Sequence, residues 1–317
     1  MTTGYQSLLT GAAVLDLSAR GRIRVSGEDR ARLLHAMTTN HIQQLKPGEG
    51  LYAFFLNAQG RIQADAYVLC YPEHFILDTE PETRALVYEH LDRYIIADDV
   101  TLEDVSEATF CLGLEGPAFA SVAEAAHVAM PASPVSQVEW NAGSVAAISF
   151  TGASGVRIYG SAQAKAGVVA ALEGAGAVAA SGQDADQVRI MNFKARFGVD
   201  ITEQTLPQES QQMHALHFQK GCYLGQEIVE RIRSRGHVNK NLMGFRIESH
   251  ATDGTHLVEP GMKLFTGGKE AGEVTSATVC PEGVVYGLAY VRVPYNKPGG
   301  TVGIEGRPAE LFAPWGA

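Results

Sequence analysis

The first hundred residues alternate between strand-like and helix-like patterns of apolar positions. The pattern predicts a strand over residues 22–25, followed by a helix that Ser26 caps and that turns Leu33, Leu34 and Met37 to one face. It then predicts a three-stranded meander, a helix opened by a proline and a further strand, at 51–57, 61–71, 75–78, 81–94 and 99–105. Because no regular βαβ alternation appears, we expect α+β units with antiparallel sheets.

The remaining two thirds of the chain divide into an Ala- and Gly-rich middle and a strand-rich end. Helices are expected near 117–126 and 161–173, with a strand over 144–150 between them. From Leu242 onward, short apolar runs separated by Gly and Pro predict a small β-barrel, with strands over 242–248, 263–265, 273–277 and 284–291. We therefore expect residues 1–241 to hold two interleaved α+β domains and residues 242–317 to form the barrel.

Composition and charge narrow the class of protein. Hydrophobic residues make up 45% of the 317 residues and charged residues 19%, which is typical of a folded, water-soluble chain. The net charge of −10 argues against nucleic-acid binding, which needs a basic surface. One segment differs: residues 220–246 carry six basic and two acidic side chains, and such a patch can hold a small anion.

The cysteines and the N-terminus bear on compartment and metal binding. Cys70, Cys111, Cys222 and Cys280 lie at least 40 residues apart, without a C-x-x-C pair, so we expect no metal site and a reducing compartment. The cluster of His214, His217 and Cys222 is weighed as incidental rather than as a metal site. The N-terminus lacks a signal or transit pattern and no apolar run approaches 18 residues, so we expect a cytoplasmic monomer without a membrane span.

The stretch Lys220-Gly221-Cys222-Tyr223-Leu224-Gly225-Gln226-Glu227, here called the octet, contains the best candidate for a reactive thiol. Cys222 lies between two glycines, just before a helix predicted from Gln226 to Arg235. The helix N-terminus, Lys220 and the arginines of that helix favour the thiolate form. The alternative interpretation is a tight turn in which Cys222 is a small buried apolar residue.

The octet resembles the K-G-C-Y-x-G-Q-E signature of the YgfZ family, folate-binding proteins that are similar to the glycine cleavage T-protein and support iron–sulfur enzymes. The flanking segments 206–209 and 233–236 extend the likeness. Further stretches resemble parts of the T-protein fold, at 14–18, 25–27, 38–40, 56–62, 189–201 and 272–276. The resemblance implies three domains in a ring, two of them α+β and one a β-barrel, around a central hole that holds tetrahydrofolate.

The same resemblance implies a set of folate-binding residues, namely Asn57, Asp65, Arg189, Asn192, Tyr223, Gln226, Glu227 and Arg231. Two departures from T-proteins bear on the chemistry. The usual pair of adjacent aspartates is Ala64-Asp65 here, which leaves one carboxylate as a base or charge stabiliser. Arg189-Ile190 is followed by Met191 instead of a glutamate, so Asn192 is the remaining candidate partner for the pterin edge.

Three functions follow as hypotheses. The leading one is a tetrahydrofolate-binding protein that helps to build or repair iron–sulfur clusters in client or assembly partners. The Cys222 thiol is expected to be the reactive group, exposed near the bound folate, with Lys220 tuning its ionisation. The second is a folate-dependent aminomethyltransferase or demethylase that uses Asp65. The third is a scaffold that docks onto cluster-carrying partners without folate. For Arg231 and its neighbours, the alternatives are capture of the folate glutamate tail and a solvated helix face.

Overall fold

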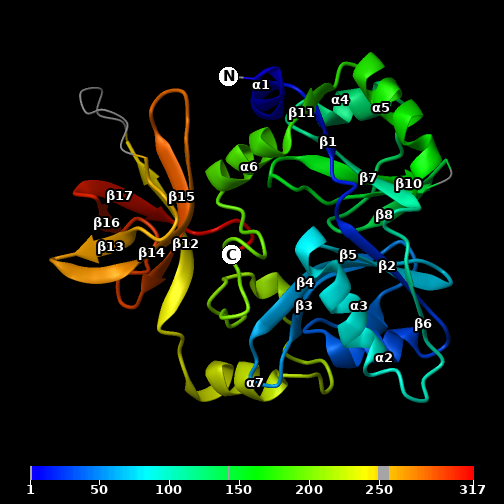
Figure 1. Ribbon diagram of the computed structural model, residues 1–317, viewed down its shortest axis with the longest axis horizontal. Helices are drawn as coiled ribbons and strands as arrows, with labels where there is room; N and C mark the ends of the chain where they lie inside the picture. Colours follow the sequence, from blue (N-terminus) through cyan, green and yellow to red (C-terminus); the bar gives the residue numbers. More distant parts are fainter. Residues whose placement is uncertain (1, 142, 249–256) are drawn as a thin grey trace.

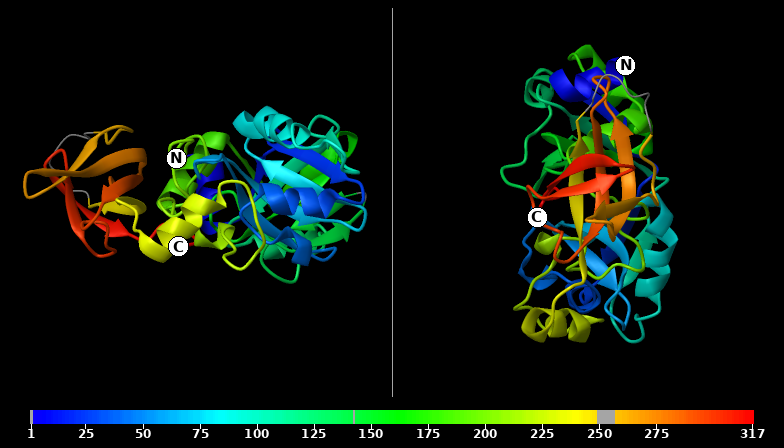
Figure 2. Two further views of the ribbon diagram at one scale, coloured as in Figure 1. Left: turned by 90° about the horizontal axis from the view of Figure 1, so that it is seen from below. Right: turned by 90° about the vertical axis from the view of Figure 1, so that its left-hand side faces the viewer.

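The computed structural model describes residues 2–141, 143–248 and 257–317, which form three sheets in three domains. Figure 1 shows the two α+β domains on one side, the barrel on the other, and the C-terminus in the region that they surround. Figure 2 shows the barrel at one end of the long axis. The expected α+β architecture with a ring of three domains is confirmed. Within the described part of the chain, no helix is both long and apolar enough to span a bilayer.

The first domain is built on a five-stranded antiparallel sheet with the order β3-β4-β5-β2-β6. Helices α2 and α3 pack on one face of this sheet. The expected meander is confirmed as β3, β4 and β5. The elements are β2 (Gly21–Ser26), α2 (Arg30–Met37), η1 (Ile42–Gln44), β3 (Gly50–Leu56), β4 (Ile62–Cys70), β5 (His74–Thr79), η2 (Pro81–Thr83), α3 (Arg84–Asp92) and β6 (Thr101–Asp104).

Both helix starts in this domain lie later than the sequence predicts. Ser26 is the last residue of β2 rather than a helix cap, so that prediction is wrong. Gly27 adopts φ 101° and packs so closely on Asp99 that a Cβ would lie 2.1 Å from the Asp99 carbonyl oxygen. This tight turn delays α2 to Arg30. Pro81 begins a single 3₁₀ turn, after which α3 starts at Arg84.

Strand β4 faces two different cores, and this fixes where Asp65 points. Ala64 and Ala66 belong to the core beneath α2 and α3. Tyr67 and Leu69 belong to a second core, which they share with residues of the neighbouring sheet. Because successive side chains of a strand point to opposite faces, Asp65 lies on the same face as Tyr67, toward the other domains.

The second domain is built on a six-stranded sheet with the order β11-β1-β7-β10-β9-β8, antiparallel except for the pair β1 and β11. The two expected helices are confirmed as α4 and as η3 followed by α5. Strands β7 and β10 and helix α6 were not predicted. The elements are α1 (Thr3–Thr10), β1 (Ala13–Asp16), β7 (Thr109–Glu115), α4 (Phe119–Ala125), β8 (Gln137–Trp140), β9 (Gly143–Ala146), β10 (Gly155–Ser161), η3 (Ala162–Ala164), α5 (Lys165–Gly174), β11 (Val178–Ala180) and α6 (Gly182–Met191).

A loop segment, η4 and α7 lead into the closed barrel, whose strand order is β12-β15-β14-β13-β16-β17. The four predicted strands are confirmed. The last two were missed because both are short and Pro308 interrupts the apolar pattern. The elements are η4 (Met213–Ala215), α7 (Gln226–Arg235), β12 (Lys240–Ile247), β13 (Lys263–Thr266), β14 (Lys269–Val279), β15 (Val285–Arg292), β16 (Thr301–Ile304) and β17 (Arg307–Phe312).

Candidate functional site

The domains meet around a narrow, partly enclosed polar cavity. Both α+β sheets, the segment after α6, η4 and the C-terminal segment contribute to its wall. Charged and aromatic side chains dominate that wall: Arg20, Tyr52, Asp65, Tyr67, Asp78, Glu80, Phe150, Arg157, Arg189, Lys194, Arg196, His214 and Trp315. A wall of this kind offers charged and hydrogen-bonding groups to a polar ligand.

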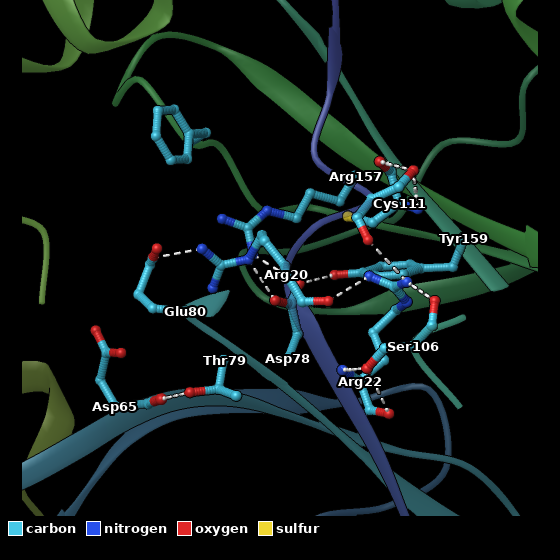
Figure 3. Close-up of polar contacts among 12 residues, drawn as sticks. Arg20, Arg22, Asp65, Asp78, Thr79, Glu80, Ser106, Cys111, Arg157 and Tyr159 are labelled. Atoms are coloured by element: carbon cyan, nitrogen blue, oxygen red, sulfur yellow. Dashed lines mark hydrogen bonds and ion pairs between the residues drawn. The ribbon is translucent and has the colours of Figure 1, made fainter. Parts of the chain in front are cut away.

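Asp78 joins the two α+β sheets through a buried ion network (Figure 3). It lies on β5, is fully buried, and contacts Arg20 Nε at 2.5 Å and Arg157 Nη1 at 2.7 Å. Tyr159, which like Arg157 belongs to β10, donates its hydroxyl to the same carboxylate at 2.5 Å. Burial alone would raise the pKa of Asp78, but Arg157 and Arg20 outweigh it and hold the pKa well below its ordinary value. Asp78 is therefore ionised and paired.

Glu80 extends this network to the segment after α6. Arg20 also pairs with the Glu80 carboxylate, and Arg196 Nε contacts Glu80 Oε2 at 2.9 Å. Arg196 reaches Glu82 with its other end, at 2.7 Å. Although burial raises the pKa of Glu80, the two guanidinium groups lower it below its ordinary value. Arg20 is thus paired with both Asp78 and Glu80, and the three hold the cavity wall together.

Arg189, a predicted folate-binding residue, lies at the cavity, but it also takes part in a polar contact with the barrel. Its Nη1 contacts Asp200 Oδ2 at 2.7 Å, and Asp200 Oδ1 accepts hydrogen bonds from the hydroxyls of Thr275 and Ser276, both at 2.6 Å. The register shift between Val274 and Ser276 in β14 explains how two successive side chains reach one carboxylate. Arg189 Nη2 is buried and has no hydrogen-bond partner among the described residues, which leaves its two N–H groups for a ligand.

Asp65 is the cavity carboxylate without a cationic partner within the described residues. Its Oδ2 accepts the Tyr52 hydroxyl at 2.5 Å, whereas Oδ1 is buried and unpartnered. Figure 3 shows its side chain on the same side of the sheet as that of Glu80. Burial, reinforced by the charge of Glu80, raises the pKa of Asp65 to about 6 despite the Tyr52 hydrogen bond. Such a carboxyl group exchanges its proton near neutral pH and offers a free acceptor.

Asn192 lies beside this cavity, but its amide is already used. Its Nδ2 donates to the Thr151 carbonyl oxygen at 3.0 Å. A Cβ at Gly152 would approach both Asn192 Cβ, at 3.3 Å, and the Trp315 ring, at 3.1 Å. Asn192 therefore helps to pack the loop against the C-terminal segment, and its Oδ1 is the atom that remains for a ligand.

Lys220 anchors the octet to the C-terminal end of α2. Its Nζ donates to the carbonyl oxygens of His35 and Thr38 and lies over the Tyr223 ring, 4.7 Å from the centroid. The backbone N–H of Leu224 adds a bond to the Ala36 carbonyl oxygen at 3.0 Å. These carbonyls are the unsatisfied acceptors at a helix end, so Lys220 acts as a C-terminal cap. Burial lowers the pKa of the Lys220 amine to about 7.

Cys222 is exposed, unlike Cys70, Cys111 and Cys280, which are buried. The interpretation of Cys222 as a small core residue is therefore wrong. Cys222 does not belong to the cavity wall, which includes His214, eight residues earlier in the same segment. The thiol is therefore open to solvent. Within the described residues, no group of three His, Cys, Asp or Glu side chains is placed to hold a metal ion.

The other octet positions and Asn57 form a second group, outside the cavity wall. Asn57 closes the β3–β4 turn, because its Oδ1 accepts the backbone N–H groups of Gln59 and Arg61, each at 3.0 Å. Gly225 adopts φ 81° as the N-cap of α7, and a Cβ there would lie 2.5 Å from the Asn57 carbonyl oxygen. The octet glycine is thus required by the hairpin tip that packs on it.

The predicted helix from Gln226 to Arg235 is confirmed as α7. Gln226 Oε1 accepts the Tyr223 N–H at 3.3 Å, while Glu227 and Arg231 are exposed. The basic segment 220–246 does not form a single patch. Its Lys220 is turned to α2, and Arg246 lies on β12, where it pairs with Glu248. The arginines of α7 remain as its exposed part.

Of the predicted site residues, the structure brings Asp65 and Arg189 together at the cavity and places Asn192 beside it. It gathers Asn57, Lys220, Cys222, Tyr223 and Gln226 around the octet instead, with Glu227 and Arg231 exposed on α7. Sequence reasoning missed most of the cavity wall, above all Tyr52, Arg157, Lys194 and Trp315. The sequence contains no decisive local signal for them, since a charged residue between two apolar ones, as in Val156-Arg157-Ile158, equally predicts a solvated strand face.

Comparisons with known proteins cover nearly the whole chain. The family described as GCVT N-terminal domain matches residues 3–220, and the glycine cleavage T-protein C-terminal barrel domain matches residues 240–312. An aminomethyltransferase from Rubrobacter xylanophilus is 28% identical over 96% of this chain and 82% of its own length. One from Nostoc sp. is 26% identical over 96% of this chain and 83% of its own length.

A solved structure shows the same fold. The glycine cleavage system aminomethyltransferase T from Bartonella henselae superposes with a TM-score of 0.85, covering 98% of this chain and 87% of that chain. The two sequences are 19% identical, so the likeness concerns the fold.

Proposed function

Because the chain belongs to the glycine cleavage T-protein family, we propose that its central cavity binds tetrahydrofolate and that the octet thiol, Cys222, serves the assembly or repair of iron–sulfur clusters in partner proteins. The observation that carries the folate part is Asp65, a buried carboxyl group with an unpartnered oxygen at the junction of the domains. The pterin ring and its amine nitrogens supply the N–H donors that such an acceptor lacks.

The position of Cys222 supports two separate binding surfaces, one for folate and one for a partner protein. Folate binds at the cavity, whereas the exposed Cys222 does not line it and is open to a partner protein. The segment from His214 to Cys222 links the two surfaces. His214, at its start, lines the cavity, and Lys220, near its end, donates to carbonyl oxygens at the C-terminal end of α2. The octet is the signature by which this chain resembles the YgfZ branch of the family, in which iron–sulfur support is the expected role.

Replacing Asp65 by Asn should weaken tetrahydrofolate binding by about 10- to 100-fold, because a hydrogen bond to a charged acceptor contributes roughly 1.5–3 kcal/mol. Isothermal titration calorimetry of wild type and Asp65→Asn measures the change. Asp16→Asn is the matched control, since its carboxylate is an exposed partner of Lys165 on the edge of the second domain. Equal affinities of wild type and Asp65→Asn would remove Asp65 from the folate site.

The affinity for tetrahydrofolate should also depend on pH. The pKa of Asp65 in the free protein is raised to about 6, and only the ionised carboxylate accepts N–H groups with both oxygens. Affinity should therefore be constant above about pH 7 and fall below pH 6, approaching tenfold for each pH unit. Calorimetry between pH 5.5 and 8 tests this. The pH dependence should disappear in Asp65→Asn, and a profile unchanged by that substitution would contradict the assignment.

The second candidate is a folate-dependent aminomethyltransferase or demethylase. It is favoured by the same raised pKa, because a carboxyl group that titrates near 6 can accept and return a proton at neutral pH. Formation of methylene-tetrahydrofolate from an aminomethylated carrier or an N-methylated amine would establish this activity. A scaffold that works without folate is the third hypothesis, and it predicts no binding heat with tetrahydrofolate.

A further inference from the structure

Lys194 differs from the other cations of the cavity wall. Each of the four arginines there, Arg20, Arg157, Arg189 and Arg196, has a carboxylate oxygen within 2.9 Å. Lys194 has none within 4.0 Å among the described residues, although it is only 9% exposed. A buried ammonium without a counter-ion is costly, and the cost falls if the amine is neutral or reacts.

Lys194 is held in place by two contacts of its side chain and two hydrogen bonds of its main chain. Its Nζ donates to the Ser149 carbonyl oxygen and lies over the Trp315 ring, 4.2 Å from the centroid. Both main-chain polar groups of Lys194 are also bonded. Its N–H donates to the Arg189 carbonyl oxygen at 2.8 Å, and its carbonyl oxygen accepts Arg189 Nη1 at 2.9 Å. The amine is therefore a positioned group on the cavity wall.

The surroundings of Lys194 favour its neutral form. Burial, reinforced by the charge of Arg157, lowers the pKa of the amine to about 7. Arg20 acts in the same direction, whereas Glu115 and Glu80 oppose it. Glu115 is itself saturated by Ser149, Phe150 and Thr151, which donate to its carboxylate, so it does not pair with the lysine. A large fraction of free amine is thus present near neutral pH.

We infer that Lys194 is a capture site for a small aldehyde, with formaldehyde as the simplest case, which it holds as an imine inside the cavity. This inference rests on the proposed function in one respect, namely that tetrahydrofolate is the group that would exchange a one-carbon unit there. The charged and aromatic wall offers little surface for an alkyl chain, which restricts the aldehyde to a small one.

The reaction is a condensation without net oxidation or reduction. The Nζ lone pair attacks the carbonyl carbon, an N–C bond forms, and the carbonyl π electrons move to the oxygen, which takes up the proton released by the nitrogen. Loss of this hydroxyl with the second amine proton releases one water and leaves a C=N bond. The products are the Lys194 imine and water, and addition of water reverses the reaction.

Reductive methylation tests the inference on the wild-type protein. Formaldehyde at micromolar concentration and cyanoborohydride are added at pH 7, and each lysine is quantified by peptide mass spectrometry. Lys194 should gain methyl groups at least about tenfold faster than exposed Lys46 and Lys297, because an amine with the ordinary pKa near 10.4 is roughly 0.04% neutral at this pH. Equal rates at Lys194 and these lysines would overturn the inference.

Lys220 is the matched internal control. Its pKa is also lowered to about 7, but its Nζ is bonded to two carbonyl oxygens and lies outside the cavity wall. Lys220 should therefore react much more slowly than Lys194, and comparable rates would assign the reactivity to burial alone and overturn the proposed site.

Lys194→Arg, which keeps the charge without a nucleophilic amine, should remove the labelled peptide, and its thermal unfolding shows whether it folds. Because the labelling needs no folate, a negative result is distinguishable from a failure of tetrahydrofolate to bind, which calorimetry measures.

Discussion

Asp78→Ala should lower the free energy of unfolding by about 3–5 kcal/mol, because removing one partner of a buried ion network leaves the others charged and unpaired. Arg157 would lose its carboxylate partner, and Tyr159 would lose the acceptor of its hydroxyl. Arg20 would keep Glu80. Urea denaturation followed by circular dichroism measures the loss, which should appear in the transition that separates the two α+β sheets.

Two substitutions bracket this result. Asp78→Asn keeps the shape and one acceptor oxygen, and should cost less than the alanine because the hydrogen bonds to that oxygen persist, while the charge and the bonds to the other oxygen are lost. Glu103→Ala removes a carboxylate of the same sheet that pairs with Arg24 at the surface, and should change stability by no more than about 1 kcal/mol. If Asp78→Ala were as mild as Glu103→Ala, Asp78 would not be the link between the domains.

The contribution of the Asp78 network to the stability of the fold should also persist at low pH. The folded pKa of Asp78 is depressed, so its contribution is present above the unfolded value near 3.9 and is lost only as the pH falls through the lower folded value. The pKa of Asp65 is shifted in the opposite direction, so its effect on stability depends on pH in the opposite way. Its folded pKa of about 6 exceeds the unfolded value, so the stability gained by its protonation is present below about pH 4 and is lost as the pH rises toward 6. Of the carboxylates in the cavity wall, Asp78 and Glu80 are thus paired with arginines, whereas Asp65 is available for a ligand.

The elements with strong local signals were predictable from the sequence. The hairpin of β3 and β4 follows from two apolar runs around Ala58-Gln59-Gly60, and α7 follows from its position after Gly225. Barrel strands β12 to β15 follow from alternation between turns. In each of these, one segment and its nearest neighbour in the sequence contain the information.

The cavity wall was not predictable because its geometry is set by contacts distant in sequence. Arg157 alternates with Val156 and Ile158 in a way that predicts a solvated face, yet it is buried, since the face it occupies is covered by the first domain. Lys194 and Trp315 are brought together by the bond from Trp315 N to Phe193 O, 122 positions apart in the sequence. No periodicity encodes such a pairing.

The position of Cys222 outside the cavity wall has the same kind of cause. Sequence reasoning placed the thiol beside the folate because the octet and the lining segments share one resemblance. In the structure Cys222 is not part of the cavity wall, because Lys220 and Leu224 bond the octet to the end of α2 and Gly225 packs on the hairpin tip. The thiol is exposed, which is consistent with the proposed role on a partner protein.

Cys222→Ala should abolish rescue of iron–sulfur enzyme activity in a strain that lacks this protein, while leaving the protein folded and able to bind tetrahydrofolate. The side chain is exposed and belongs to no core cluster, so its removal should change the free energy of unfolding by less than about 0.5 kcal/mol. The thiolate is the nucleophile and the metal ligand in cysteine chemistry, and alanine can replace neither role. The measurement is the activity of a cluster-dependent enzyme in extracts, at matched levels of the two proteins.

Three comparisons make this result specific. Cys222→Ser keeps the size and polarity of the side chain but lacks an easily ionised group, so it should fail as the alanine does. Cys70→Ala removes a buried thiol and should retain rescue despite some loss of stability. Asp65→Asn should reduce rescue only as far as it reduces folate binding. Full rescue by Cys222→Ala would show that the exposed thiol has no role in cluster maintenance. It would instead favour the hypothesis that the protein is an aminomethyltransferase.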